Sequence, residues 1–350
     1  MHMRSLFFAI VAVAGLAIAI NWDPSQPCII TTSFLHDFVC SQLLGNHNMS
    51  THHVSPARRL LRRIGLGFAL AVSALTTHAQ TAATALELKV INHGANSFYV
   101  NSVLVQGAKE AVLLDAGFTR ADALRVAAAV LDSGKKLTTI YVSAADPDYY
   151  FGLEVLRQEF PEAKIVAAAP TLAMIEALLP TKLKTWGPRM GVNAPRKPVL
   201  PEAMSGSTLS LEGQSIEVRG LDDSMPHRSY VWIPSIKAVL GGTNILASGM
   251  HVWTADTQTV AERQAWVAKL DKIAALQPAI VIPGHNLPGV AQDLSTVRYT
   301  QQYLGRFETE LSKAKDSAAL ISAMKTAYPQ AGAGMSLEIG AKVNKGEMKW

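Results

Sequence analysis

The sequence predicts an α+β fold, a four-layer αββα sandwich in which helices cover the outer faces of two packed sheets. The predicted elements follow the order strand-rich, helical, strand-rich and helical, and this arrangement is one of the stable ways to bury such elements. Apolar residues make up 49% and charged residues 17% of the chain, a composition typical of a globular domain and not of a disordered one. No internal repeat or low-complexity linker interrupts the chain after residue 85. We therefore predict one domain over residues 81–350.

The first half of this domain alternates strands with helices. Period-two apolar patterns and short buried runs predict strands at 86–91, 98–106, 111–114, 137–142 and 164–168. Helical patterns cover 120–133, 150–160 and 170–179. A segment rich in Pro and Gly follows, to about residue 205, and carries Trp186 and Met190. We predict that it is a surface loop near the mouth of a site, because binding residues concentrate on such loops.

The second half repeats the pattern. Strands are predicted at 208–211, 215–220, 229–233 and 238–240. Thr259 and Glu262 have the spacing of a capping box and should open a helix. A strand is predicted at 279–282, and Pro283-Gly284-His285 follows it. Two helices are predicted after that, at about 291–314 and 316–327.

The N-terminal 80 residues contain two apolar stretches. Leu6–Ile20 is short for a membrane span, which needs roughly 20 residues. Residues 49–80 have the basic, apolar and small-residue parts of a secretory signal peptide, with cleavage expected after Ala79. We expect translation from Met49, an upstream extension over 1–48, and a periplasmic or secreted product. The alternative is that Leu6–Ile20 is a genuine anchor, so that membrane contact would come only through an uncleaved N-terminus.

Charge and cysteine content narrow the function classes. Residues 1–80 contain five arginines and two aspartates, so the remaining chain carries a net charge of +2 out of the total of +5. This balance, without a basic stripe, argues against nucleic-acid binding. Both cysteines, Cys28 and Cys40, lie in this N-terminal part. The domain therefore has no cysteine ligand for zinc and no internal disulfide.

Two carboxylates follow the strand at 137–142. Asp146 and Asp148 stand beside Tyr149 in a loop at the C-terminal end of that strand, where α/β proteins bind ligands. The same residues also suit an ordinary turn with a helix N-cap. Tyr149 has two interpretations: packing at a helix start, or a hydroxyl that lines the pocket and donates a hydrogen bond to substrate. Three tryptophans are candidates for an apolar pocket, although core packing is the default for them: Trp186, Trp232 and Trp253.

Four landmarks in order resemble those of the metallo-β-lactamase superfamily. They are Asp115-Ala116-Gly117, the loop at 143–152, His227 before a strand, and Pro283-Gly284-His285 after one. The superfamily's loop reads Thr-His-x-His-x-Asp-His-x-x-Gly. The resemblance covers about residues 86–315 and implies the αββα fold.

The same comparison identifies altered positions. Ala144, Asp146 and Tyr149 stand where the superfamily has histidines, and Thr243 stands where it has a bridging aspartate. His251 and His93 are predicted to be structural. The retained residues are enough for one metal ion, since three protein ligands and a water make a catalytic zinc site.

The resemblance implies a hydrolase of a small ester, lactone or amide that uses a metal-activated water. One divalent ion, zinc or else manganese or iron, would be held among Asp146, Asp148, His227 and His285. Asp148 would orient or deprotonate the water, with Tyr149 as the second catalytic candidate. The alternative is a metal-free, catalytically inactive protein that binds a small molecule. The partner is a small-molecule substrate in either case, and the sequence specifies neither that substrate nor the oligomeric state.

Overall fold

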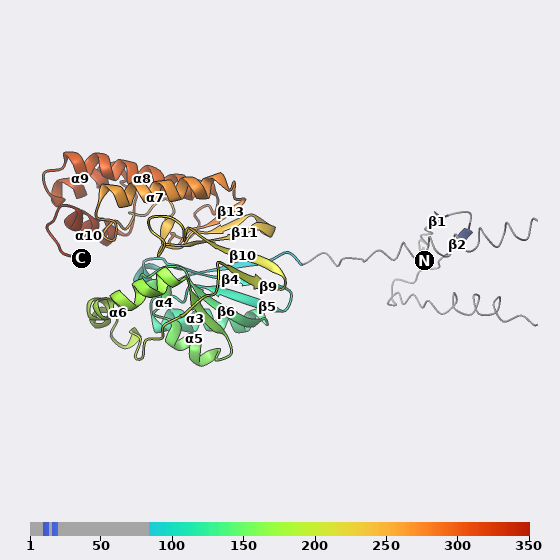
Figure 1. Ribbon diagram of the computed structural model, residues 1–350. Coiled ribbons are helices and arrows are strands. Elements are labelled where there is room, and N and C mark those ends of the chain that lie inside the picture. The colour runs from blue at the N-terminus through green and yellow to red at the C-terminus, as the bar shows by residue number, and fades with distance from the viewer. Residues whose placement is uncertain (1–9, 14–15, 20–83) are drawn as a thin grey trace, which may run out of the picture. The chain divides into compact units, whose positions relative to one another are not determined.

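The computed structural model describes residues 10–13, 16–19 and 84–350 (Figure 1). The chain divides into two units, Met1–Thr81 and Ala82–Trp350. Within the first unit, β1 (Ile10–Val13) pairs antiparallel with β2 (Leu16–Ala19). The predicted upstream extension at 1–48 is described only in this pair, and the predicted signal peptide at 49–80 lies outside the described residues.

The first sheet of the second unit has six strands in the order β3-β4-β5-β6-β7-β8. Strands β3 to β5 pair antiparallel, and β5 to β8 pair parallel. The parallel strands place their carboxyl ends along one edge, which is the edge that carries the loop after β6. The strands are β3 (Glu87–Asn92), β4 (Asn101–Gln106), β5 (Glu110–Leu114), β6 (Lys136–Val142), β7 (Lys164–Ala167) and β8 (Glu202–Ala203).

The second sheet has five strands in the order β13-β12-β11-β10-β9. All neighbours pair antiparallel except β12 and β13, which are parallel and therefore end at the same edge. The strands are β9 (Thr208–Leu211), β10 (Gln214–Arg219), β11 (Tyr230–Ile233), β12 (Ala238–Leu240) and β13 (Ile280–Ile282).

The two sheets pack face to face around a shared apolar core. Val105 and Leu114 from the first sheet belong to the same buried cluster as Ile216 and Val231 from the second. Figure 1 shows α3 and α5 against the outer face of the first sheet, and α7 and α8 over the second. The predicted αββα sandwich is therefore confirmed. The helices are α3 (Arg120–Ser133), α4 (Pro147–Tyr150), α5 (Leu153–Glu159), α6 (Ala169–Met190), α7 (Val260–Ala275), α8 (Leu294–Lys313), α9 (Ser317–Ala327) and α10 (Gly334–Asn344).

Most element predictions hold, including the capping box of Thr259 and Glu262 at the start of α7. The predicted helix at 170–179 is too short, because α6 continues through Pro180 and Pro188 to Met190. A proline removes one helical hydrogen bond, and here the burial of side chains beyond Pro180 offsets that loss. The predicted surface loop therefore begins only after α6. The helix α10 was not predicted at all.

The predicted helix at 150–160 is divided into α4 and α5 around Gly152. A side chain at Gly152 would collide with the carbonyl oxygen of Ala116. None of the helices in the described part of the chain is both long and apolar enough to cross a bilayer.

Candidate active site

The site lies where strands of both sheets end. The loop after β6 carries Asp146 and Asp148, the short helical turn Gly242–Asn244 follows β12, and His285 follows β13. The hydroxyl of Thr243 donates a hydrogen bond of 3.1 Å to Asp146 Oδ2. This bond joins the edge of the second sheet to the loop of the first, so residues far apart in sequence meet at one place.

Asp148 and His285 form a close pair of ionisable groups at the site. His285 Nε2 lies 3.4 Å from Asp148 Oδ2. The Nδ1 atom of His285 lies 2.9 Å from the carbonyl oxygen of Phe98. Because a carbonyl oxygen only accepts, Nδ1 carries a proton and Nε2 faces the carboxyl group.

The proton balance of this pair follows from its burial. Burial lowers the pKa of His285 to about 4. Burial, and then the charge of Asp146, raise the pKa of Asp148 well above its ordinary value. Both shifts favour neutral groups, and a proton on Asp148 can donate to Nε2. The pair is therefore suited to accepting and returning one proton.

Asp146 lies at the pocket wall and is half-buried. Burial raises its pKa, the negative charge of Asp256 adds to the effect, and Lys182 and Arg228 oppose it. Its hydrogen bond from Thr243 also favours the charged form. Asp146 is thus an acid with a raised pKa that shares its surroundings with two cationic side chains.

The structure separates His227 from this group. His227 is half-buried and does not line the pocket described below, and its carbonyl oxygen accepts a bond of 3.3 Å from Thr171 Oγ1. Burial, followed by the charges of Arg228 and Lys269, lowers its pKa to about 4. The structure therefore does not bring this predicted ligand to the pocket.

Tyr149 also stands apart from the pocket wall. Its buried ring packs edge-on against the His285 ring at a centroid distance of 5.8 Å. Its hydroxyl has no hydrogen-bond partner among the described residues and faces Gly242 and Gly284, where an added side chain on Gly284 would collide with it. The described geometry corresponds to packing behind His285.

An open pocket lies over the Asp148–His285 pair. Its empty volume is about 650 Å³, which includes the solvent at its mouth. Five aromatic side chains form much of its wall, and they contact one another edge-on or at a tilt in most cases. Of the three tryptophans considered, Trp186 and Trp253 line the pocket, whereas Trp232 lies in β11 and packs in the core. The aromatic lining is Phe98, Phe118, Trp186, Trp253 and Trp350, and the polar lining is Asp146, Asp148, Lys182, Thr243, Asp256, His285 and Ser336.

Lys182 and Asp256 are polar residues of the pocket that were not predicted. Lys182 lies one turn before Trp186 on α6, so both point to the same side of the helix. The spacing of four residues between Lys182 and Trp186 could have predicted that they share a helix face. It did not, because the predicted helix ended before Pro180. Asp256 accepts hydrogen bonds from the indole nitrogens of Trp253 (2.5 Å) and Trp350 (2.7 Å).

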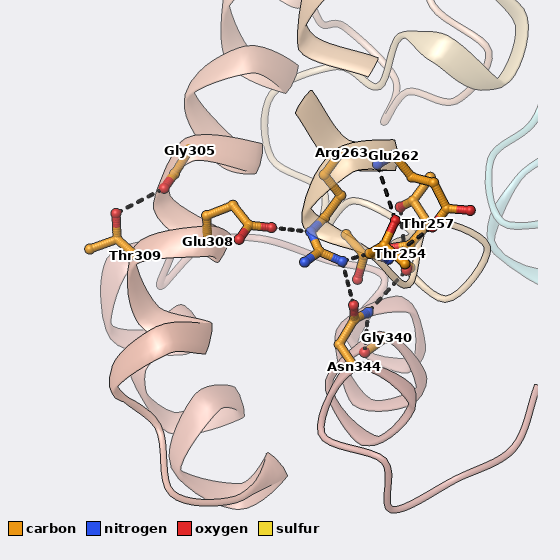
Figure 2. A network of polar contacts seen from close by, with 10 residues as sticks. Thr254, Thr257, Glu262, Arg263, Gly305, Glu308, Thr309, Gly340 and Asn344 are labelled. Carbon is orange, nitrogen blue, oxygen red and sulfur yellow. Dashed lines mark hydrogen bonds and ion pairs between the residues drawn. The ribbon is translucent and has the colours of Figure 1, made fainter. Parts of the chain in front are cut away.

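The loop that carries Trp253 and Asp256 is held from outside the pocket by Arg263 of α7 (Figure 2). Arg263 is buried and donates to the carbonyl oxygen of Thr257 at 2.6 Å. It also pairs with Glu308 of α8 and donates to Asn344 of α10. Figure 2 shows these partners converging on one guanidinium group, which therefore ties three helices to the pocket loop.

Comparisons with known proteins decide the family. The sequence pattern of the metallo-β-lactamase superfamily matches residues 95–285, more than half of the chain. The chain belongs to the metallo-β-lactamase superfamily. No curated protein matches it.

Solved structures agree with this membership in fold. A metallo-β-lactamase family protein from Thermus thermophilus is 16% identical with a TM-score of 0.55, over 75% of this chain and 92% of that one. A metallo-β-lactamase from Pontibacter korlensis is 14% identical with a TM-score of 0.45, over 64% of this chain and 96% of that one. The first likeness shows the superfamily fold, and the second is too distant to carry an argument.

Members of this superfamily usually bind divalent metal ions. The question is whether the four predicted ligands of this chain lie close enough together to hold one. Of the four predicted ligands, only Asp148 and His285 lie within ion-pair distance of each other. Among the described residues, no three His, Cys, Asp or Glu side chains converge as a metal site requires. Thr243 Oγ1 occupies one oxygen of Asp146. The arrangement therefore does not fit a metal ion, and no step below passes through one.

Proposed function

We propose that this superfamily member hydrolyses a small ester, lactone or amide in its aromatic pocket. The observation that carries the proposal is the Asp148–His285 pair, whose Oδ2 and Nε2 atoms lie 3.4 Å apart at the pocket wall. The hydrogen bond from His285 to the Phe98 carbonyl fixes which ring nitrogen faces Asp148. A positioned acid–base pair at the wall of a pocket can activate a water molecule for hydrolysis.

In this proposal the chain's own groups move the proton. A water molecule next to the pair attacks the substrate carbonyl carbon while the pair, with Asp148 as its carboxylate and His285 neutral, takes up the proton of that water. The raised pKa of Asp148 makes its carboxylate a stronger base than an exposed aspartate. When the tetrahedral intermediate collapses, the pair returns the proton to the leaving alcohol or amine. The products are a carboxylic acid and that leaving group.

The apolar walls of the pocket determine which substituent of the substrate fits. Five aromatic rings with Leu246 and Met250 offer a surface for an aryl or short alkyl group. We therefore propose apolar esters or lactones with an aromatic or compact aliphatic substituent.

A second candidate is a protein that binds such a molecule without turning it over. Ala144, Tyr149 and Thr243 favour it, because they occupy positions that hold metal ligands in the superfamily. Ala144 and Tyr149 are also fully buried and packed, as inert core residues are. This candidate shares the pocket but assigns no proton transfer to Asp148.

Turnover of aryl acetates, phenyl lactones and matching amides distinguishes the two candidates. We expect the wild-type protein to release acid from at least one class, and Asp148→Asn to lose roughly 10²-fold or more in kcat. Asp271→Asn, which removes an exposed carboxylate bonded to Gln301, is the matched control and should keep full activity. Tight binding with turnover at the buffer rate in all three proteins would establish the binding candidate instead.

A further inference from the structure

The ammonium group of Lys182 faces the pocket that contains the Asp148–His285 pair. Its side chain is only 8% exposed, and it is the one Lys or Arg side chain among the lining residues. We propose that Lys182 is a catalytic residue that binds the oxyanion formed when water attacks the substrate carbonyl. This inference rests on the proposed hydrolase function and assigns the electrophilic role that the superfamily's metal ions would otherwise fill.

The hydrogen-bonding state of Lys182 supports this role. The ammonium has three N–H donors, and within the described part of the chain it makes no hydrogen bond. Its ion-pair partner is Asp256, whose Oδ1 lies 3.7 Å away, an ion-pair distance and not a hydrogen-bond distance. Both oxygens of Asp256 already accept from indole nitrogens of Trp253 and Trp350. The donors of Lys182 therefore remain free for a ligand.

The acidic side chains around the pocket create a need for a cation such as Lys182 when an oxyanion forms. Asp146, Asp148 and Asp256 all line the cavity. The carboxylates of Asp146 and Asp256 would oppose the negative charge that develops on the carbonyl oxygen, since Asp148 shares the proton taken from the water at that point. The charge of Lys182 acts on both Asp146 and Asp148, whose pKa values it lowers. An ammonium within the same cavity offsets the repulsion, and a preorganised donor of this kind is usually the largest single contribution to such catalysis.

Arg228 is the other cation near these acids, and its contacts exclude it from this role. Its guanidinium donates to the carbonyl oxygen of Thr243 at 3.0 Å and lies 4.0 Å from the centre of the Trp266 ring. It does not line the pocket. Arg228 therefore acts on Asp146 from within the protein, and Lys182 is the cation that a substrate can reach.

The step balances with the groups present. The oxygen of water forms a bond to the carbonyl carbon, and its proton passes to the Asp148–His285 pair. The π electrons of the carbonyl move to its oxygen, which becomes an oxyanion beside Lys182. Collapse reforms the carbonyl, breaks the bond to the leaving oxygen or nitrogen, and returns the proton to that atom. In this step Lys182 donates a hydrogen bond to the oxyanion and transfers no proton.

Lys182 could instead have a purely structural role, which predicts a different result. The Lys182 ammonium lies 5.1 Å from the centre of the Trp350 ring, close enough for a cation–π contact that would help to hold the C-terminal segment over the pocket. If this contact were its whole purpose, removing the charge would weaken every ligand alike. An oxyanion-binding Lys182 affects anionic ligands selectively.

The test measures binding of methyl benzylphosphonate, a tetrahedral monoanion, and of its neutral dimethyl ester by calorimetry. We expect the wild-type protein to bind the monoanion at least roughly tenfold more tightly, since hydrogen bonds to charged groups have about this strength. Lys182→Met should lose that preference and keep its affinity for the neutral ester. Lys182→Arg should retain most of the preference.

The other outcomes have equally definite meanings. No anion preference in the wild-type protein, no binding of either phosphonate, or an equal loss for both in Lys182→Met would overturn the proposal. With a turned-over ester, Lys182→Met should lower kcat roughly 10²-fold with little change in KM. Selective phosphonate binding without turnover would refute the hydrolase function and keep Lys182 as an anion site. Turnover that survives Lys182→Met would refute the role of Lys182 alone.

Discussion

The carboxylate of Asp115 accepts two hydrogen bonds of 2.8 Å from Ser143, one from its backbone N–H and one from its hydroxyl. Asp115 directly follows β5 and has a left-handed backbone (φ 64°), and Ser143 begins the loop after β6. These bonds fix the start of the loop that carries Asp146 and Asp148. They join two landmarks that the sequence analysis had treated separately.

Asp115 should make stability depend on pH. Burial raises its pKa to about 7, so the folded state binds a proton that the unfolded state releases near pH 4. Its contribution is therefore most favourable at low pH and is lost as the pH rises through 7. We expect Asp115→Asn to remove on the order of 4 kcal/mol of this dependence, as an upper bound. Asparagine tolerates the left-handed backbone, so the comparison isolates the charge.

Denaturant unfolding of both proteins at several pH values between 4 and 8 provides the measurement. His227 and His285, with pKa values lowered to about 4, act in the opposite direction, and their contribution to stability is lost as the pH falls from 6.5 towards 4. They are present in both proteins and cancel in the difference. Identical pH profiles for the two proteins would contradict the assignment.

Arg263→Met should destabilise the protein by about 3 kcal/mol, because it leaves the buried partners of the guanidinium without a donor. The estimate is at the lower end for a buried pair, since the Glu308 side chain is 30% exposed. Arg306→Met is the matched control, because the Arg306 side chain is 50% exposed in its pair with Glu310 and should matter little. Thermal unfolding of the three proteins checks this, and equal effects of the two substitutions would count against the network in Figure 2.

His285→Gln should lower kcat on the preferred ester by roughly 10²-fold or more, since the pair then loses its ring nitrogen for the shared proton. KM should change little, because the aromatic wall remains. Near-ultraviolet circular dichroism serves as the control for folding of the wall tryptophans. Full activity in a well-folded His285→Gln protein would remove His285 from the mechanism.

Metal content is the fourth prediction. We expect elemental analysis of protein purified without added metal to find no stoichiometric zinc, manganese or iron, because only Asp148 and His285 converge. Treatment with EDTA should leave the melting temperature unchanged. A stoichiometric ion that disappears in both Asp148→Ala and His285→Ala would restore the single-ion site expected from the resemblance.

Export is the last prediction. We propose that the signal peptide at 49–80 directs the chain to the periplasm and is removed after Ala79. N-terminal sequencing of protein recovered from the periplasmic fraction should then begin at Gln80. Recovery in the membrane fraction with residues 1–20 intact would instead identify Leu6–Ile20 as an anchor.

The sequence alone determined the layers and the landmarks. Period-two runs, the capping box at Thr259 and the strand ending at His285 are local patterns, and each predicts its element without reference to distant residues. The order of those elements, together with the four landmarks that resemble the superfamily, predicted the αββα sandwich, because few layer arrangements bury such elements. The resemblance assigned Asp148 and His285 to one predicted metal site, and the structure brings these two side chains together as a direct pair.

Only the tertiary structure decided which groups share the pocket. Lys182 reaches it because α6 continues past Pro180, and the burial of Lys182 and Trp186 beyond that proline depends on packing that no local pattern encodes. Trp350 and Asp256 meet 94 residues apart in sequence through one hydrogen bond. His227 matched its landmark, yet it does not line the pocket. Side-chain convergence is set by the packing of whole layers, so sequence spacing alone could propose a ligand set but could not position it.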